Sequence, residues 1–182
     1  MPILDDVLEY GLEVVFCGTA AGFEAARRQA YYAGPGNRFW ATLHAVGFTD
    51  RLLAPEEFRT VLAYGLGLTD LVKNVAGNDR NLRPSDFDVA QLKKEILKYQ
   101  PRFLAFVGKR AATEFLGRKV EYGLQPKEDM VNATSLFVLP APGGARGAIG
   151  TKAHGGSWLG REAVSSSSVF GAASLFLPEE SG

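Results

Sequence analysis

Short apolar runs recur along the chain, and each ends in a glycine, a polar residue or a turn. Four of them have the length and composition of buried strands, over residues 13–17, 66–69, 103–107 and 135–139. Between the runs, apolar residues at helical spacing predict four helices, over residues 38–46, 55–64, 86–99 and 109–116. Because strands alternate with helices, we expect a single α/β domain whose mostly parallel central sheet is flanked by helices.

Ligands bind beyond the carboxyl ends of the strands in a sheet of this kind. Two glycine-containing loops are predicted there, residues 18–22 after the first strand and residues 139–146 after the last. Residues 74–85 are polar and rich in turn formers, so we expect a surface loop that covers a site. We place the domain over residues 1–147 and a divergent tail, rich in glycine and serine, over residues 148–182.

The composition is that of an ordinary globular protein, with 46% hydrophobic and 22% charged residues. No apolar run reaches the ~18 residues that a membrane-spanning helix needs. Asp5 and Asp6 stand where a secretory signal would carry positive charge, so we expect a cytoplasmic protein without membrane contact, and a monomer. Because Cys17 is the only cysteine and the two histidines, His44 and His154, lie far apart, we expect no disulfide, no metal and no cofactor.

The chain has 20 basic and 20 acidic residues, which give a formal net charge of zero. Taken alone, that balance argues against binding nucleic acid through bulk positive charge. Five acidic residues precede Arg27, the first basic one, and three follow Arg161, the last. Residues 27–161 therefore hold 12 acidic and 20 basic residues, a net charge of +8. The neutrality is the sum of a basic body and acidic ends, and DNA stays open as a partner.

Three strings of residues resemble a known family. They are Gly18-Thr19-Ala20-Ala21-Gly22, Tyr31-Tyr32-Ala33-Gly34-Pro35-Gly36-Asn37-Arg38-Phe39-Trp40 and Leu139-Pro140-Ala141-Pro142-Gly143-Gly144-Ala145-Arg146. Together they resemble the mismatch-specific uracil/thymine-DNA glycosylases of the uracil-DNA glycosylase superfamily, over about residues 8–147 and in the same order. The resemblance implies an enzyme without metal or cofactor that flips a damaged base out of the duplex, at a cost of a few kcal/mol, and lets water attack C1′ of the sugar.

The resemblance also implies roles for residues that bind the base. Gly18, Thr19 and Ala20 belong to the first string, where backbone amides beside glycine can approach the base closely and stabilise a departing uracil anion. Tyr32 is expected to stack on the flipped base, an interaction worth ~1–3 kcal/mol. Asn37 is expected to recognise or position the base through its amide.

A second set of residues is expected to contact the DNA itself. Lys109, at the start of a predicted helix, is a candidate phosphate contact. Gly143 and Gly144 belong to the third string, in which Ala145 and Arg146 would fill the gap left by the flipped nucleotide, because a planar guanidinium can stack and also bind phosphate or an orphaned base. The partner that the resemblance implies is double-stranded DNA containing uracil, with single-stranded DNA as a further substrate.

The first string departs from the family at one position. Active relatives carry there, two residues after the glycine, an asparagine that orients the attacking water, and this chain has Ala20. The catalytic candidates are Thr69, which matches a threonine of the family near the water, and Asp70, whose carboxylate can stabilise an oxocarbenium-like sugar. Both can face the site only if the strand has already ended, because adjacent strand residues face opposite sides. Glu24 and Asp79 are weaker candidates.

Two functions stay open from the sequence. One is a monofunctional glycosylase that removes uracil, with other deaminated bases as further substrates, by attack of water, since no lysine lies in the pocket strings to form a Schiff base. The alternative is a damage- or abasic-site-binding protein of the same fold whose catalysis is weak or lost through Ala20. A nucleotide hydrolase with a phosphate-binding loop is disfavoured, because residues 18–22 lack the Gly-Lys-Ser/Thr ending.

Overall fold

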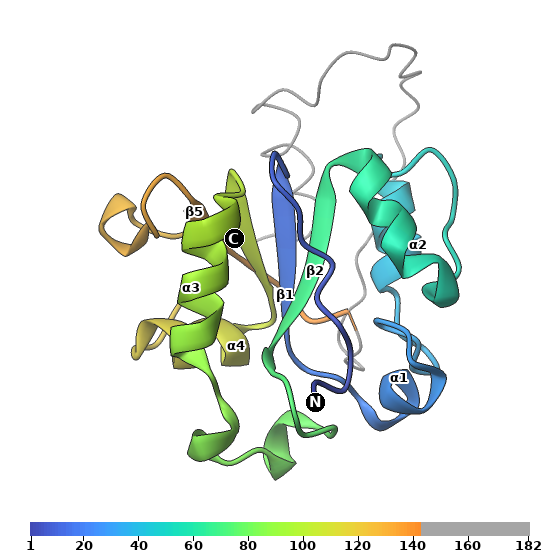
Figure 1. The fold of residues 1–182 in the computed structure, drawn as a ribbon, viewed down its shortest axis with the longest axis horizontal. Helices are drawn as coiled ribbons and strands as arrows, with labels where there is room; N and C mark the ends of the chain where they lie inside the picture. Colours follow the sequence, from blue (N-terminus) through green and yellow to red (C-terminus); the bar gives the residue numbers. More distant parts are fainter. Residues whose placement is uncertain (143–182) are drawn as a thin grey trace, which may run out of the picture.

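The computed structural model describes residues 1–142 of the 182-residue chain. Its centre is a five-stranded sheet with the strand order β2-β1-β3-β5-β4 (Figure 1). Strands β1 (Val14–Ala20), β2 (Leu66–Val72), β3 (Phe103–Val107) and β5 (Ser135–Leu139) are parallel. The short edge strand β4 (Gly123–Leu124) pairs antiparallel with β5. Residues 143–182, with the predicted Gly143, Gly144, Ala145 and Arg146 and the tail over 148–182, lie outside the described residues.

Helices cover both faces of the sheet and form two hydrophobic cores with it. One face packs against α3 (Val89–Tyr99) and α4 (Lys109–Leu116) through residues such as Val15 and Phe106. The other packs against α2 (Phe39–Ala45) and the 3-10 helix η1 (Pro55–Tyr64) through residues such as Phe16 and Leu68. Neighbouring residues of β1 thus enter different cores, as the alternation of strand side chains requires. The predicted α/β fold with a mostly parallel sheet is confirmed.

Helix boundaries follow from local capping. Helix α3 begins at Val89 rather than at residue 86, because the carboxylate of Asp88 accepts the backbone N–H of Gln91 at 2.9 Å and so caps the helix. The short elements were not predicted, since one or two turns carry too little periodicity. They are α1 (Phe23–Arg28) and the 3-10 helices η2 (Asp79–Asn81), η3 (Pro84–Asp86) and η4 (Lys127–Asp129).

Two strands are longer than their apolar runs. The first strand was expected over residues 13–17, but β1 continues to Ala20, and β2, expected over residues 66–69, continues to Val72. The cause is pairing: β1 lies between β2 and β3, and the ladder of β1 with β2 extends through Gly18–Asp70 and Ala20–Val72. On the other side of β2, the N-terminal segment pairs antiparallel at Val7–Leu68 and covers the edge that would otherwise expose unpaired backbone.

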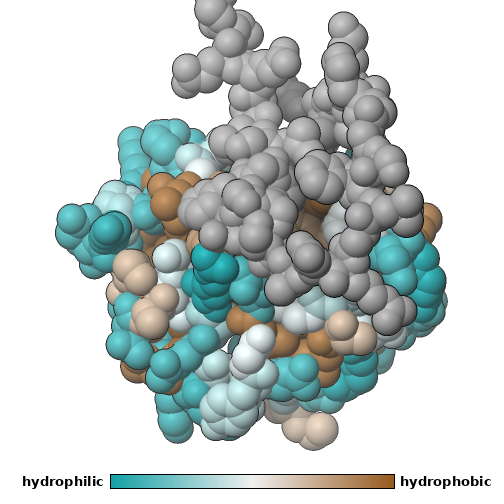
Figure 2. Space-filling view, turned by 90° about the horizontal axis from the view of Figure 1, so that it is seen from above, coloured by the Kyte–Doolittle hydropathy of each residue, from teal (hydrophilic) through white to brown (hydrophobic). Residues whose placement is uncertain are grey.

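The carboxyl ends of the parallel strands lie at the lower edge of the sheet in Figure 1, next to α1 and the loop that joins β2 to α3. Figure 2 views the molecule from the other end, where hydrophilic residues make up much of the visible described surface and hydrophobic residues lie between them. Within residues 1–142, no helix has both the length and the apolar character needed to cross a membrane.

Candidate active site

A cavity of about 600 Å³ lies at the carboxyl ends of β1, β2 and β3. Its walls come from the end of β1 and the turn after it, residues 31–37, the loop after β2, the start of α4 and residues 141–142. Seven of the residues expected at the site line it: Gly18, Thr19, Ala20, Tyr32, Asn37, Asp70 and Lys109. Segments far apart in the sequence thus meet where an α/β sheet binds its ligands.

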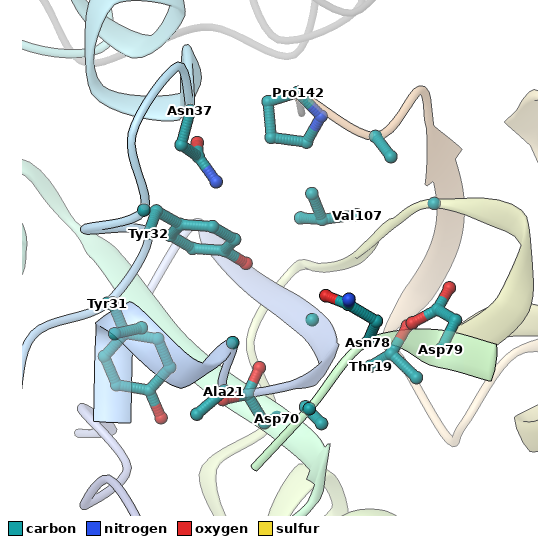
Figure 3. A pocket seen from close by; sticks show the side chains of 18 of the residues that line it. Thr19, Ala21, Tyr31, Tyr32, Asn37, Asp70, Asn78, Asp79, Val107 and Pro142 are labelled. Carbon is teal, nitrogen blue, oxygen red and sulfur yellow. The ribbon is translucent and has the colours of Figure 1, made fainter. Parts of the chain in front are cut away.

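Asp70 lies against Gly18 at the base of this cavity (Figure 3). The two residues are partners in the β1–β2 ladder, and a methyl group on Gly18 would lie 2.3 Å from Oδ1 of Asp70 and 3.3 Å from the hydroxyl of Tyr32. Only glycine leaves room for the carboxylate, which explains this glycine inside a strand. Gly18 was expected in a loop that brings its amide to a ligand; the structure instead shows it making space for Asp70.

The carboxyl group of Asp70 is buried and chemically unusual. Burial raises its pKa from the ordinary value of 3.8 to about 7, while Lys73 lowers the pKa and Asp6 raises it further. No hydrogen bond from the described residues acts on this carboxylate. The buried hydroxyls of Tyr31 and Tyr32 have no hydrogen-bond partner among those residues either. Burial also raises the pKa of both phenols, so they stay protonated near neutral pH. At the cavity, the Asp70 carboxylate and the Tyr32 hydroxyl, which points into it in Figure 3, are therefore left without a protein partner within residues 1–142.

Tyr32 forms part of both the core and the cavity wall. Its ring stacks on Phe39, with the ring centroids 3.8 Å apart and the planes 19° apart. Because Phe39 occupies one face, a base can stack only on the other. The backbone of Tyr32 has a φ of 55°, a left-handed conformation that is uncommon for a tyrosine and typical of positions held in place for function.

Asn37 is held by a local hydrogen bond that orients its amide. Its Oδ1 accepts the backbone N–H of Phe39 at 2.9 Å, so the NH₂ group is the end that remains available. Figure 3 shows this end directed toward the cavity, above Tyr32. The arrangement leaves the NH₂ group of Asn37 free to donate a hydrogen bond, while its oxygen holds the loop.

Thr69 is not brought to the cavity. Because β2 continues past it, Thr69 faces away from Asp70, and its Oγ1 donates to Oδ1 of Asp6 at 2.8 Å. Lys73 donates to Thr69 at 2.7 Å and forms an ion pair with Asp6, so the three side chains satisfy one another. The expectation that Thr69 stands near the water is corrected by this geometry.

Comparison with known proteins shows which family the chain belongs to. The model of the uracil DNA glycosylase superfamily matches residues 6–152, four fifths of the chain. The chain belongs to this superfamily. It is also similar to a solution NMR structure from Methanosarcina acetivorans described as a "putative Uracil DNA glycosylase", at 26% identity and a TM-score of 0.49, over 78% of this chain and 84% of that one. The match to the family model confirms the superfamily part of the resemblance.

In this superfamily member, the loop after β2 supplies residues that the sequence did not single out as central. Asn78 and Asp79 line the cavity, and Gly77 anchors them, since its N–H donates to the carbonyl of Ala21 at 2.9 Å. The sequence makes Asp79 only a weaker catalytic candidate, and it does not single out Asn78. The polar, turn-rich composition of residues 74–85 was the available signal, but it indicates a loop rather than a particular side chain.

The other charged groups of the wall are already paired. Arg27 donates to Glu24 at 2.9 Å and lowers the pKa of that carboxyl. Lys109 pairs with Glu121 at 2.7 Å, and its Nζ lies 4.5 Å from the ring centroid of Tyr122. Among residues 1–142, no group of three histidine, cysteine, aspartate or glutamate side chains is placed to hold a metal ion.

Proposed function

We propose that this superfamily member is a monofunctional DNA glycosylase that flips uracil, and related deaminated bases, out of DNA and hydrolyses the bond between base and sugar. One observation carries the proposal: a buried carboxylate, an aromatic ring and an amide donor, from Asp70, Tyr32 and Asn37, line one cavity at the carboxyl ends of the strands. A flipped base needs such a stacking surface and such hydrogen-bond donors, together with a group that stabilises the sugar as it becomes cationic.

The geometry of each group supports the role that we propose for it. Tyr32 offers the free face of its ring for stacking, and the NH₂ of Asn37 can donate to a carbonyl oxygen of the base. Gly18, Thr19 and Ala20 line the same cavity. We assign Asp70, in its ionised form, to stabilise the oxocarbenium-like sugar and to accept the proton of the attacking water.

Contacts to the rest of the DNA are proposed from the resemblance and the charge. Lys109 can exchange Glu121 for a phosphate, because an ion pair with a side chain that is 90% exposed is worth only about 0–1 kcal/mol. Arg146, with Gly143, Gly144 and Ala145, is proposed to fill the gap left by the base, as in mismatch-specific relatives. The partner is DNA containing uracil, double-stranded first, bound by a cytoplasmic monomer that uses no cofactor.

A second function is favoured by one observation. Ala20 lines the cavity with a methyl group where active relatives carry an asparagine, and a protein that binds damaged or abasic DNA with weak or lost catalysis would need no side chain there. The two functions predict the same DNA binding and differ only in whether the damaged base is released from the DNA.

The test is single-turnover excision from an end-labelled duplex with one uracil, followed by alkali. We expect strand cleavage that depends on alkali, and a rate about 100-fold lower for Asp70→Asn, because the carboxylate acts on the reacting atoms. The matched control is Asp5→Asn, an exposed carboxylate outside the cavity, which should keep the wild-type rate. Absence of cleavage at stoichiometric enzyme would overturn the glycosylase, and retained binding of the abasic duplex would then favour the second function.

A further inference from the structure

Position 20 is the place where the cavity lacks a polar side chain. Ala20 ends β1, pairs with Val72 of β2 and contributes only a methyl group and its backbone to the wall. A methyl group cannot hold a water molecule for attack on C1′. If the reaction is hydrolysis, another group in this part of the cavity must orient the water.

The loop after β2 brings Asn78 to the same place. Gly77 is buried, and its N–H donates to the carbonyl of Ala21, one residue beyond position 20, at 2.9 Å. The same glycine lies against Phe23, whose ring would be 3.7 Å from a methyl group at that position. The loop is therefore fastened directly beside the end of β1, and Asn78 is the next residue along it.

The amide of Asn78 is not used by the protein. The residue stands directly before η2, at the position where an asparagine usually accepts a hydrogen bond from the first turn. Here no such side-chain bond is formed, and the described residues offer the amide no other partner. Figure 3 shows the amide of Asn78 projecting into the cavity, toward the side on which Tyr32 and Asp70 lie. Both its donor and its acceptor are available to a ligand.

We propose that Asn78 is the catalytic residue that orients the attacking water in place of the side chain missing at position 20. This inference rests on the glycosylase function proposed above. The C1′–N1 bond breaks and its electron pair leaves with the base as the uracil anion. The oxygen of the water held by Asn78 forms the new bond to C1′, and its proton passes to the carboxylate of Asp70. The products are an abasic deoxyribose and, once the anion gains a proton from solvent, free uracil.

The experiment compares Asn78→Ala with Asn74→Ala, an exposed asparagine of the same loop that does not line the cavity. We expect Asn78→Ala to lower the single-turnover rate by about 10- to 100-fold, and Asn74→Ala to leave it unchanged. Affinity for a duplex with a non-hydrolysable 2′-fluoro-deoxyuridine should change little in either variant, because Asn78 acts on the water rather than on the DNA.

A double variant separates the inference from a general effect of the loop. Ala20→Asn alone should gain little, whereas Ala20→Asn in the Asn78→Ala background should recover much of the lost rate, since either amide can hold the water. A wild-type rate for Asn78→Ala, or no recovery in the double variant, overturns the role of Asn78 and leaves the glycosylase function standing. If the wild-type protein releases no uracil, the glycosylase function fails, and this inference with it.

Discussion

Adjacent residues of β2 face two environments that differ in one respect. On one side, Thr69, Asp6 and Lys73 form a closed cluster in which each side chain has a partner. On the other side, Asp70 and the hydroxyl of Tyr32 are buried with no hydrogen-bond partner among the described residues. The first side fastens the N-terminal segment to the edge of the sheet. The second lines the cavity.

The two sides of β2 differ in the free-energy cost of their polar groups. A buried polar group without a partner costs about 1–3 kcal/mol, and a buried charge costs more. On one side of β2 the polar side chains have hydrogen-bond partners, whereas on the other side polar groups are buried without one within residues 1–142. Buried polar groups without partners that gather in one place are typical of a ligand-binding site. The cost of burying a charge also raises the pKa of Asp70, to about 7.

We expect the largest effect on stability and on excision from Gly18→Ala, at the side of β2 that lines the cavity. A methyl group 2.3 Å from Oδ1 of Asp70 must push the carboxylate or β1 away, so we expect a loss of about 1–3 kcal/mol in the free energy of unfolding and at least a 100-fold lower excision rate. Chemical denaturation and single-turnover excision measure the two effects. Gly34→Ala is the control, because Gly34 also lines the cavity but has nothing within 4 Å of the added methyl group. Equal stability of the two variants would refute the close approach of Asp70 to Gly18.

The pH profile of excision tests whether the two sides are coupled. Since only ionised Asp70 can take a proton, we expect the rate to rise about tenfold per pH unit below a pH of about 7 and to level off above it. Lys73 lowers the pKa of Asp70 and Asp6 raises it. Lys73→Met should therefore move the midpoint to higher pH and Asp6→Asn to lower pH, each by about half a unit.

Opposite shifts are the decisive readout, because both variants disrupt the same cluster. A merely destabilising effect would lower the rate in both variants without moving the two midpoints apart. Midpoints that stay at the wild-type value would show that the cluster on one side of β2 does not influence Asp70 on the other.

The smallest effect is expected for Thr69→Val, which alters only the closed cluster. The variant loses the hydrogen bond to Asp6 and the one from Lys73 but keeps the ion pair between Asp6 and Lys73, so we expect a loss of about 1 kcal/mol in stability. The excision rate should stay within about twofold of wild type, because Thr69 faces away from the cavity. A tenfold or greater fall in the excision rate, at unchanged DNA affinity, would show that Thr69 takes part in catalysis.

The sequence predicted much of this molecule. Four apolar runs located the four parallel strands, and helical spacing located α2, η1, α3 and α4 to within a few residues. The strings around Gly18, Tyr32 and Asn37 indicated the superfamily, and these residues line the cavity. Such features are local: a side-chain pattern of period two or 3.6, or a run of consecutive residues, is visible without knowing what packs against it.

Other features of the site depend on contacts between distant segments, which no local pattern shows. Thr69 and Asp70 are both polar residues at the end of an apolar run, and the run cannot show which one faces the cavity. That choice follows from the pairing of β2 with β1 and with the N-terminal segment, which carries the strand on to Val72 and turns the two side chains to opposite sides. The place of Asn78 likewise follows from one backbone hydrogen bond, from Gly77 to Ala21. Sequence determined the elements and the family; packing between elements far apart in the chain determined which polar groups face the cavity.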